Sequence, residues 1–217
     1  MKVQRRTFGA TVLAAVLVVG LTCIDQAAAV EGKTDAIVKE MRQGGLVLVF
    51  RHTATKHELP GTGPVLSQEG EDQAAGAGQM LRELRVPTGD TYTSTGKHAV
   101  ETARLARFGN VMALKALTDG SMPLSRVEGE DRAEVFRSLL RERPQRGMNV
   151  VMVADKASIV NAIGPHLVSL QEGELVVVRP DVRVEQGFDV VGRLTLREVR
   201  EYWNQRRAEP TFQRVRW

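Results

Sequence analysis

Two residue types suited to chemistry stand side by side at the end of an apolar stretch. Arg51 and His52 follow directly after residues 46–50 (LVLVF), all of which are apolar. A guanidinium group binds oxyanions through a fixed fork of donors, and a neutral imidazole can act as a nucleophile or exchange protons near pH 7. Such a pair favours an anionic ligand if the fold brings further polar groups to it.

Two more polar clusters follow predicted strands. Residues 94–98 (STGKH) come at the end of a predicted strand over 90–94, and Asp155 and Lys156 come directly after the apolar residues 149–154. In parallel α/β sheets, ligands bind beyond the carboxyl ends of the strands. We therefore expect these clusters and the Arg-His pair to meet at one edge of a sheet.

The elements that must position these side chains alternate between strands and helices. Strands are predicted at 46–50, 90–94, 111–117, 149–154, 174–180 and 186–194, the last two as a hairpin-like pair. Helices are predicted at 34–43, 68–85, 97–108, 130–143, 157–170 and 195–207, with a loop at 54–66. Because 46–50 and 149–154 lack polar alternation, they are typical of central parallel strands. The alternation predicts an α/β fold of three layers, α/β/α, around a mostly parallel central sheet.

Length and composition fit one soluble domain. The chain has 217 residues, of which 42% are apolar and 26% charged, and this is enough for one sizeable core. The formal net charge is +4, and 5% of the residues are aromatic. No basic run is interleaved with aromatic rings, so nucleic acid is not an expected partner.

Residues 1–29 have the three parts of an export signal. Basic residues near the start precede a short apolar stretch at 11–21, and small residues allow cleavage after Ala29. The apolar stretch is about half the roughly 20 residues that a membrane span needs, and an uncleaved anchor is the alternative. The RRTF sequence also resembles a twin-arginine signal, and the single cysteine, Cys23, lies in this segment. We predict an exported, periplasmic domain over 30–217 with no stable membrane span after cleavage.

Four blocks of the sequence, in this order, carry a family resemblance. The first is Arg51-His52 after a strand, and the others are LSQEGEDQAAGAGQMLREL, YTSTGKHAVETARLA and NVVMVADKASIV. Together they resemble the histidine phosphatase superfamily, whose fold is called phosphoglycerate mutase-like. The closing stretches GELVVVRPD and VVGRLT are similar to those of its small exported bacterial members. The resemblance covers residues 36–205.

The resemblance implies a reaction and a set of roles. Members of the family transfer a phosphoryl group to the signature histidine and then to water or another acceptor. His52 would be this nucleophile, and Arg51 would hold phosphate oxygens. The family requires no metal and no organic cofactor. The implied partner is a phosphorylated small molecule.

Three positions depart from the family's pattern. Thr53 stands in place of the signature glycine, and His98 stands in place of an arginine that binds phosphate. Lys97 or Lys56 could compensate for this loss of permanent charge. Asp155 stands in place of the second histidine, which would donate to a phosphate oxygen. An ionised aspartate instead repels phosphate by roughly 4 kcal/mol at about 4 Å and an effective dielectric near 20, on the order of three decades of binding or rate.

Asp155 leaves three interpretations open. It could be a protonated or proton-sharing acid that serves the leaving group, with its pKa raised by burial beside bound phosphate. It could pair with Lys156, Lys97 or His98 and turn the pocket towards a different ligand. In the third interpretation, catalysis is lost. The first functional hypothesis is accordingly a phosphomonoesterase that acts through His52, slowly or on an unusual phosphate. The alternative is a non-catalytic domain, a pseudophosphatase, that binds an anionic ligand or a protein partner.

Several polar residues near the predicted site have plainer interpretations. Ser94 could offer its hydroxyl to an anion or only close a turn. His57 could overhang the site, but we expect it to be solvated, and we expect His166 to be structural or exposed. Glu172 and Glu174 could supply a carboxylic acid near the pocket, but we favour solvated carboxylates at the end of a strand.

Overall fold

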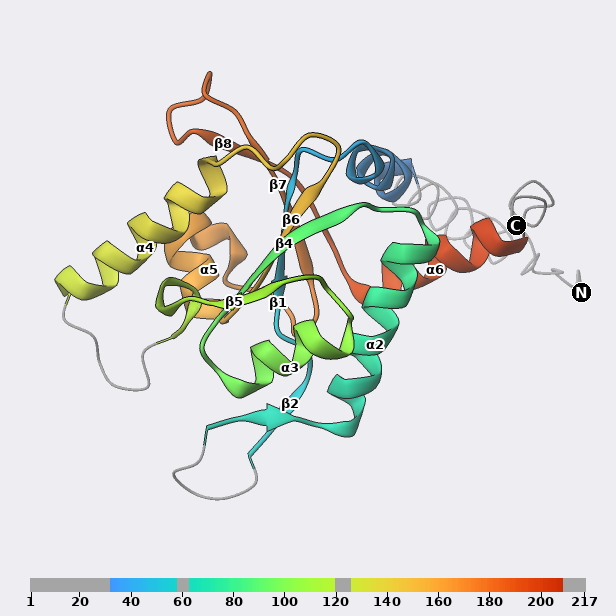
Figure 1. The fold of residues 1–217 in the computed structure, drawn as a ribbon, viewed down its shortest axis with the longest axis horizontal. Helices are drawn as coiled ribbons and strands as arrows, with labels where there is room; N and C mark the ends of the chain where they lie inside the picture. The colour runs from blue at the N-terminus through green and yellow to red at the C-terminus, as the bar shows by residue number, and fades with distance from the viewer. Residues whose placement is uncertain (1–31, 58–62, 120–125, 209–217) are drawn as a thin grey trace, which may run out of the picture.

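The computed structural model describes residues 32–57, 63–119 and 126–208. The predicted export signal at 1–29 lies outside these residues. A six-stranded sheet runs through the molecule and has helices on both sides (Figure 1). None of the helices in the described ranges is long and apolar enough to cross a membrane.

The sheet has the strand order β5-β4-β6-β1-β7-β8. Its strands are β1 (Val47–Arg51), β4 (Thr88–Thr93), β5 (Val111–Ala113), β6 (Asn149–Ala154), β7 (Leu175–Pro180) and β8 (Phe188–Leu194). The strands β1, β4, β5 and β6 run parallel to one another, whereas β7 runs antiparallel to both β1 and β8. The predicted mostly parallel sheet and the predicted pairing of the two late strands are confirmed.

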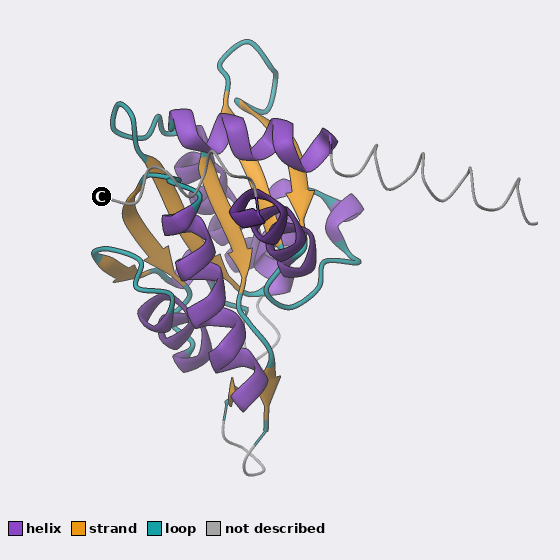
Figure 2. Ribbon diagram, turned by 90° about the vertical axis from the view of Figure 1, so that its right-hand side faces the viewer, coloured by secondary structure: helices purple, strands orange, loops and turns teal. Residues whose placement is uncertain are grey.

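Helices cover both faces of this sheet, as Figure 2 shows from the side. One face carries a helix over 32–43, α2 (Gln68–Glu83), α3 (Lys97–Leu105) and α6 (Leu196–Ala208), and the other carries α4 (Arg126–Arg141) and α5 (Lys156–Ile163). Successive residues of a strand point to opposite faces. The sheet therefore has one apolar core on each face. In β1, Leu48 and Phe50 pack into the first core, under α2, α3 and α6, and Val47 and Val49 pack into the second core, under α4 and α5. The three-layer α/β/α architecture is confirmed.

The strand predicted over 111–117 is shorter than expected. It ends at Ala113, and a 3-10 helix, η1 (Lys115–Leu117), follows. This turn buries Leu117 completely in the second core, together with side chains of α4 and α5. The predicted loop at 54–66 also differs, because its ends pair as two short strands, β2 (Thr55–Lys56) and β3 (Val65–Leu66).

The helix predicted over 157–170 is interrupted. It ends at Ile163 because Gly164 adopts φ 146°, a conformation that only glycine reaches without strain, and a proline follows. A 3-10 helix, η2 (Pro165–Leu167), continues from there. The apolar periodicity carried the prediction across a break that the Gly-Pro dipeptide enforces.

The chain after His52 is held against the start of α2. Ser67 caps this helix, since its Oγ accepts from the Gly70 N–H at 3.1 Å and donates to the Ala54 carbonyl at 3.2 Å. A Cβ atom at Gly70 would lie 2.0 Å from that same carbonyl oxygen, so any other residue would displace the backbone. Gln73 accepts from the Ala54 N–H at 3.1 Å. These contacts fix the segment that follows His52 and thereby help to fix its ring.

A buried asparagine joins the elements at the opposite edge of the sheet. Asn149 begins β6 and is completely buried. Its Oδ1 accepts from the Leu46 N–H at 3.1 Å, and its Nδ2 donates to the carbonyls of Met41 and Pro87 at 2.7 and 2.8 Å. One side chain therefore ties the helix over 32–43 to the starts of β1, β4 and β6.

Replacement of Asn149 by leucine should lower the free energy of unfolding by about 2–3 kcal/mol, because a buried N–H loses its acceptor and two carbonyls lose a donor. Urea unfolding followed by circular dichroism measures this change. The same substitution at exposed Asn204 is the control and should cost less than about 0.5 kcal/mol. Equal losses at both positions would contradict the structural importance of Asn149.

Candidate active site

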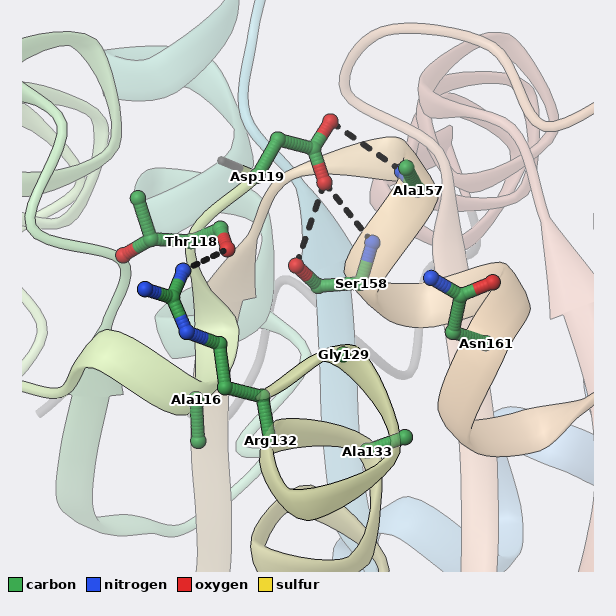
Figure 3. Close-up of a pocket in the computed structure, with 9 residues that line it drawn as sticks. All are labelled: Ala116, Thr118, Asp119, Gly129, Arg132, Ala133, Ala157, Ser158 and Asn161. Atoms are coloured by element: carbon green, nitrogen blue, oxygen red, sulfur yellow. Dashed lines mark hydrogen bonds between the residues drawn. The ribbon is translucent and has the colours of Figure 1, made fainter. Parts of the chain in front are cut away.

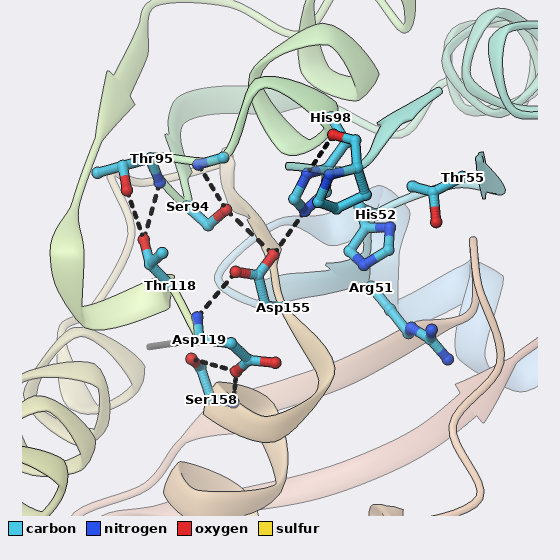
Figure 4. Close-up of polar contacts among 12 residues, drawn as sticks. Arg51, His52, Thr55, Ser94, Thr95, His98, Thr118, Asp119, Asp155 and Ser158 are labelled. Carbon is cyan, nitrogen blue, oxygen red and sulfur yellow. Dashed lines mark hydrogen bonds and ion pairs between the residues drawn. The ribbon is translucent and has the colours of Figure 1, made fainter. Parts of the chain in front are cut away.

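The predicted polar clusters meet at the carboxyl edge of the parallel strands (Figure 4). His52 follows β1, Ser94 follows β4, His98 lies in the first turn of α3, and Asp155 follows β6. All four are buried, with at most 8% of their surface exposed. The rings of His52 and His98 stand edge to face, and their centroids are 4.4 Å apart.

His52 leaves one ring nitrogen, Nε2, without a hydrogen-bond partner among the described residues. Its Nδ1 lies 3.0 Å from the carbonyl oxygen of Thr53. A carbonyl only accepts, so Nδ1 carries the hydrogen and Nε2 carries the lone pair. Burial lowers the pKa of His52 below its ordinary value and outweighs the Thr53 carbonyl, which raises the pKa. The ring is therefore neutral and nucleophilic at pH 7.

The two residues that depart most from the family's pattern contact each other. His98 Nε2 lies 2.9 Å from Asp155 Oδ1, and His98 Nδ1 lies 3.2 Å from the carbonyl oxygen of Pro64. Both oxygens face the ring as acceptors, so both hydrogen bonds form together when the ring carries two hydrogens. His98 and Asp155 therefore form one buried, hydrogen-bonded pair. This is the pairing with His98 that the second interpretation of Asp155 includes.

Asp155 is held from three sides. Besides His98, the Ser94 hydroxyl donates to Oδ1 at 3.1 Å, and the backbone N–H of Asp119 donates to Oδ2 at 2.8 Å. Burial raises the pKa of the Asp155 carboxyl, but the hydrogen bonds from His98 and Asp119 outweigh burial, and the pKa lies below its ordinary value. The pKa of Asp155 is therefore not raised in the ligand-free protein, and the first interpretation, which concerns the carboxyl beside bound phosphate, stays a prediction.

Arg51 faces a carboxylate at the same edge. Its Nη1 donates to the Leu170 carbonyl at 2.9 Å, and its Nη2 lies 3.5 Å from Glu172 Oε1. Its Nε is buried and has no hydrogen-bond partner in the part of the chain that the structure describes. Glu172 Oε1 also accepts from the Thr55 hydroxyl at 2.9 Å and lies 4.0 Å from His52 Nδ1. Glu172 therefore lies beside the candidate site, as in the alternative interpretation of this residue, and the favoured interpretation of a solvated strand end is wrong.

The other residues predicted to bind substrate, Thr53, Lys97 and Ser94, make contacts of other kinds. The Thr53 hydroxyl is engaged with the Thr102 hydroxyl at 3.1 Å. Lys97 is exposed, and the partner of Asp155 is His98 instead. The Ser94 Oγ closes a turn, since it accepts from the Gly96 N–H at 3.2 Å. The same hydroxyl donates to the carboxylate of Asp155.

Two histidines and a glutamate lie outside the cluster. His57 and His166 are exposed, as predicted for solvated residues. Glu174 is only 4% exposed, so its prediction as a solvated carboxylate is wrong. It pairs with Arg193 at 2.7 Å and accepts from the Gln171 N–H at 2.8 Å. Glu174 therefore stiffens the turn that carries Glu172.

The sequence analysis missed Asp119, which supports Asp155 through its backbone. The Asp119 carboxylate accepts from the Ser158 N–H at 2.8 Å and from the Ser158 hydroxyl at 3.1 Å, at the start of α5. It borders a cavity of about 210 Å³ (Figure 3), lined by Ala116, Thr118, Asp119, Gly129, Arg132, Ala133, Ala157, Ser158 and Asn161. A signal was present, since Asp119 follows the predicted strand at 111–117 as the other polar clusters follow theirs.

Comparison with known proteins identifies the fold. No family model and no curated protein matches the sequence. The structure of the protein histidine phosphatase SixA complexed with tungstate aligns with a TM-score of 0.53 and 14% identity, over 71% of this chain and 99% of that chain. This chain has the histidine phosphatase fold. A mutant phosphoserine phosphatase from Entamoeba histolytica in complex with phosphoserine aligns with a TM-score of 0.52 and 14% identity, over 70% and 98% of the two chains.

The Asp155 pair predicts a specific dependence of stability on pH. Because folding lowers the pKa of Asp155, its ionised form stabilises the fold at pH values above its ordinary value of 3.8, and this contribution is lost as the pH falls through the folded-state pKa. Asp155→Asn should therefore cost about 1–3 kcal/mol at pH 7 and progressively less below pH 3.8.

Urea unfolding between about pH 2 and 7 measures this difference. Asp131→Asn, at an exposed carboxylate, is the control and should change stability little at any pH. A cost of Asp155→Asn that grows towards low pH would show that the native carboxyl is held protonated instead.

Proposed function

We propose that this protein hydrolyses phosphate monoesters and that the phosphoryl group passes through Nε2 of His52. The observation that carries the proposal is the state of this ring, in which Nδ1 is bound to the Thr53 carbonyl and Nε2 is free. The ring is buried and directly follows Arg51 in the chain. A fixed neutral imidazole near a guanidinium suits phosphoryl transfer, because such catalysis is mostly positioning and neutralisation of phosphoryl oxygens.

The proposed reaction has two steps. First, the Nε2 lone pair forms a bond to phosphorus while the P–O bond to the alcohol breaks, and the leaving oxygen takes the proton shared by His98 and Asp155. Second, water attacks phosphorus, the P–N bond breaks, and the proton lost by water returns to the pair. Throughout, the Thr53 carbonyl accepts from Nδ1 and stabilises the positive charge that develops on the His52 ring.

The pairing of His98 with Asp155 reduces the penalty for an aspartate at this position. An isolated carboxylate would repel phosphate, but an imidazolium at 2.9 Å offsets most of its charge at longer range. The cluster still lacks the second permanent cation of the family's pattern, and Glu172 adds negative charge near Arg51. We therefore propose slow turnover.

The fold and the predicted export signal support the rest of the proposal. Proteins with this fold include a protein histidine phosphatase and a phosphoserine phosphatase with phosphoserine bound. These neighbours support a phosphorylated small molecule as the substrate class. The composition of residues 1–29 supports export to the periplasm.

A second candidate function is that of a pseudophosphatase that binds an oxyanion or a protein partner without turnover. The contact between Arg51 and Glu172 favours it, because the guanidinium that would hold phosphate already faces a carboxylate. Tungstate, the ion in the SixA complex, is a suitable probe. Tungstate binding without hydrolysis of any phosphate ester would support this second function.

The purified protein should hydrolyse an aryl phosphate, and His52→Ala should abolish the reaction, since Nε2 of His98, the other histidine of the cluster, is engaged with Asp155. His166→Ala, at an exposed histidine, is the control and should retain full activity. Because burial lowers the pKa of His52, the acidic limb of kcat/KM should lie below pH 6.5. Initial rates from about pH 4 to 8 measure both effects. Activity that survives in His52→Ala would sink the proposed mechanism.

Restoration of the family's pattern should raise the rate. We expect Asp155→His to increase kcat/KM by about tenfold or more, because a donor replaces an anion next to the phosphoryl oxygens. The double variant His98→Arg with Asp155→His should be faster still, since the single variant leaves His98 without its carboxylate. Steady-state kinetics on the same ester measure both variants. A fall in kcat/KM in both variants would contradict this expected gain and would show that the shared proton of the native pair contributes more to the rate than an added donor does.

A further inference from the structure

The buried cluster has a second chemistry that the resemblance does not imply. We propose that His52, His98 and Asp155 bind a divalent transition metal ion, for which Zn²⁺ is the probe. Each of the three is buried and offers one ligand atom, and these atoms all lie within 4.8 Å of one another. Two imidazoles and one carboxylate are a common protein donor set for such ions and leave a coordination position open.

The orientation of both imidazoles carries the proposal. Histidine ligands of metal ions almost always donate the hydrogen of the second ring nitrogen to a carbonyl or carboxylate, which fixes the ring and its tautomer. Here His52 Nδ1 lies 3.0 Å from the Thr53 carbonyl, and His98 Nδ1 lies 3.2 Å from the Pro64 carbonyl. Both rings therefore direct Nε2 away from a backbone anchor, as ligands of one ion require.

The carboxylate has outer-shell support of the same kind. Asp155 Oδ2 accepts from the Asp119 N–H at 2.8 Å, and Oδ1 accepts from the Ser94 hydroxyl at 3.1 Å. Both donors can remain in place when a metal ion replaces the His98 N–H at Oδ1. Such outer-shell hydrogen bonds hold a ligating carboxylate in position.

The three ligand atoms need to move only a little to bind one metal ion. Neighbouring ligands of a tetrahedral zinc ion, at bonds of about 2.0–2.1 Å, lie about 3.3 Å apart. His98 Nε2 and Asp155 Oδ1 are already 2.9 Å apart and would separate slightly. The largest separation in the cluster is below 4.8 Å, so side-chain rotation by roughly 1.5 Å brings the atoms onto one ion.

The donor types distinguish this site from a magnesium site. Mg²⁺ prefers oxygen ligands in octahedral geometry, whereas two imidazole nitrogens suit Zn²⁺, Co²⁺ and related ions. Under the proposed function, the ion would occupy the same Nε2 of His52 that attacks phosphorus. Metal and phosphoryl transfer would then exclude each other, although metal binding itself does not depend on phosphatase activity.

Calorimetric titration of the purified, untagged protein with Zn²⁺ tests the proposal directly. We expect one equivalent to bind, with affinity lowered by about tenfold or more in each of His98→Gln and Asp155→Asn. His166→Gln, which removes an exposed histidine, should bind as the wild type does. Mg²⁺ should give no comparable binding. Titration with Co²⁺ should produce visible absorption bands typical of four or five ligands.

Two results would overturn the metal site. One is the absence of stoichiometric Zn²⁺ binding to the folded wild-type protein. The other is unchanged binding in both ligand variants, which would assign the ion to surface histidines. Circular dichroism shows whether each variant is folded, and the Co²⁺ spectrum of the wild type stands independently of the variants. Both readouts are separate from ester hydrolysis, so a failure of the proposed phosphatase activity would leave this test intact.

Discussion

The parallel pairing of β1 with β6 is the constraint on which the site depends. Its register places Arg51 opposite Ala154, so the two strands end at the same level. The residues that follow them, His52 and Asp155, therefore lie at the same edge of the sheet. The pairing is secured at the other end by Asn149, whose amide binds the backbone before β1 and β4. A slip of one residue would turn every β1 side chain to the wrong face of the sheet.

The second organising feature is the contact between His98 and Asp155. By the family resemblance, each residue taken separately would weaken a phosphate site, since one would replace a permanent cation and the other would introduce an anion. At 2.9 Å they instead form one hydrogen-bonded pair, and the Ser94 hydroxyl and the Asp119 N–H donate further hydrogen bonds to the Asp155 carboxylate. The two departures from the family's pattern are therefore physically coupled, and neither is interpretable without the other.

The electrostatic balance of the cluster bears on both of the proposed ligand chemistries. Arg51 supplies a permanent positive charge, Glu172 opposes it at 3.5 Å, and His98 shields the Asp155 carboxylate through a hydrogen bond at 2.9 Å. A phosphate dianion meets less attraction here than two arginines would provide. A divalent cation would instead find two imidazole nitrogens and a carboxylate whose orientation is already fixed by hydrogen bonds to outer-shell groups. Under the two proposals, the residues that would slow phosphoryl transfer are also those that would favour metal binding.

The sequence by itself determined the layered α/β fold and the edge of the sheet at which polar residues collect. Both follow from short-range rules, since apolar runs without alternation make central strands and their ends share one edge. The tertiary structure alone decided which polar residues touch. Glu172 and Glu174 look alike in the sequence, but one reaches Arg51 and the other is buried against Arg193. The sequence left three interpretations of Asp155 open, and the hydrogen bonds from His98 and from the Asp119 N–H, which lower its pKa, are visible only in the folded protein. Ionisation depends on groups that are distant in the chain and close in space, and no local pattern encodes those distances.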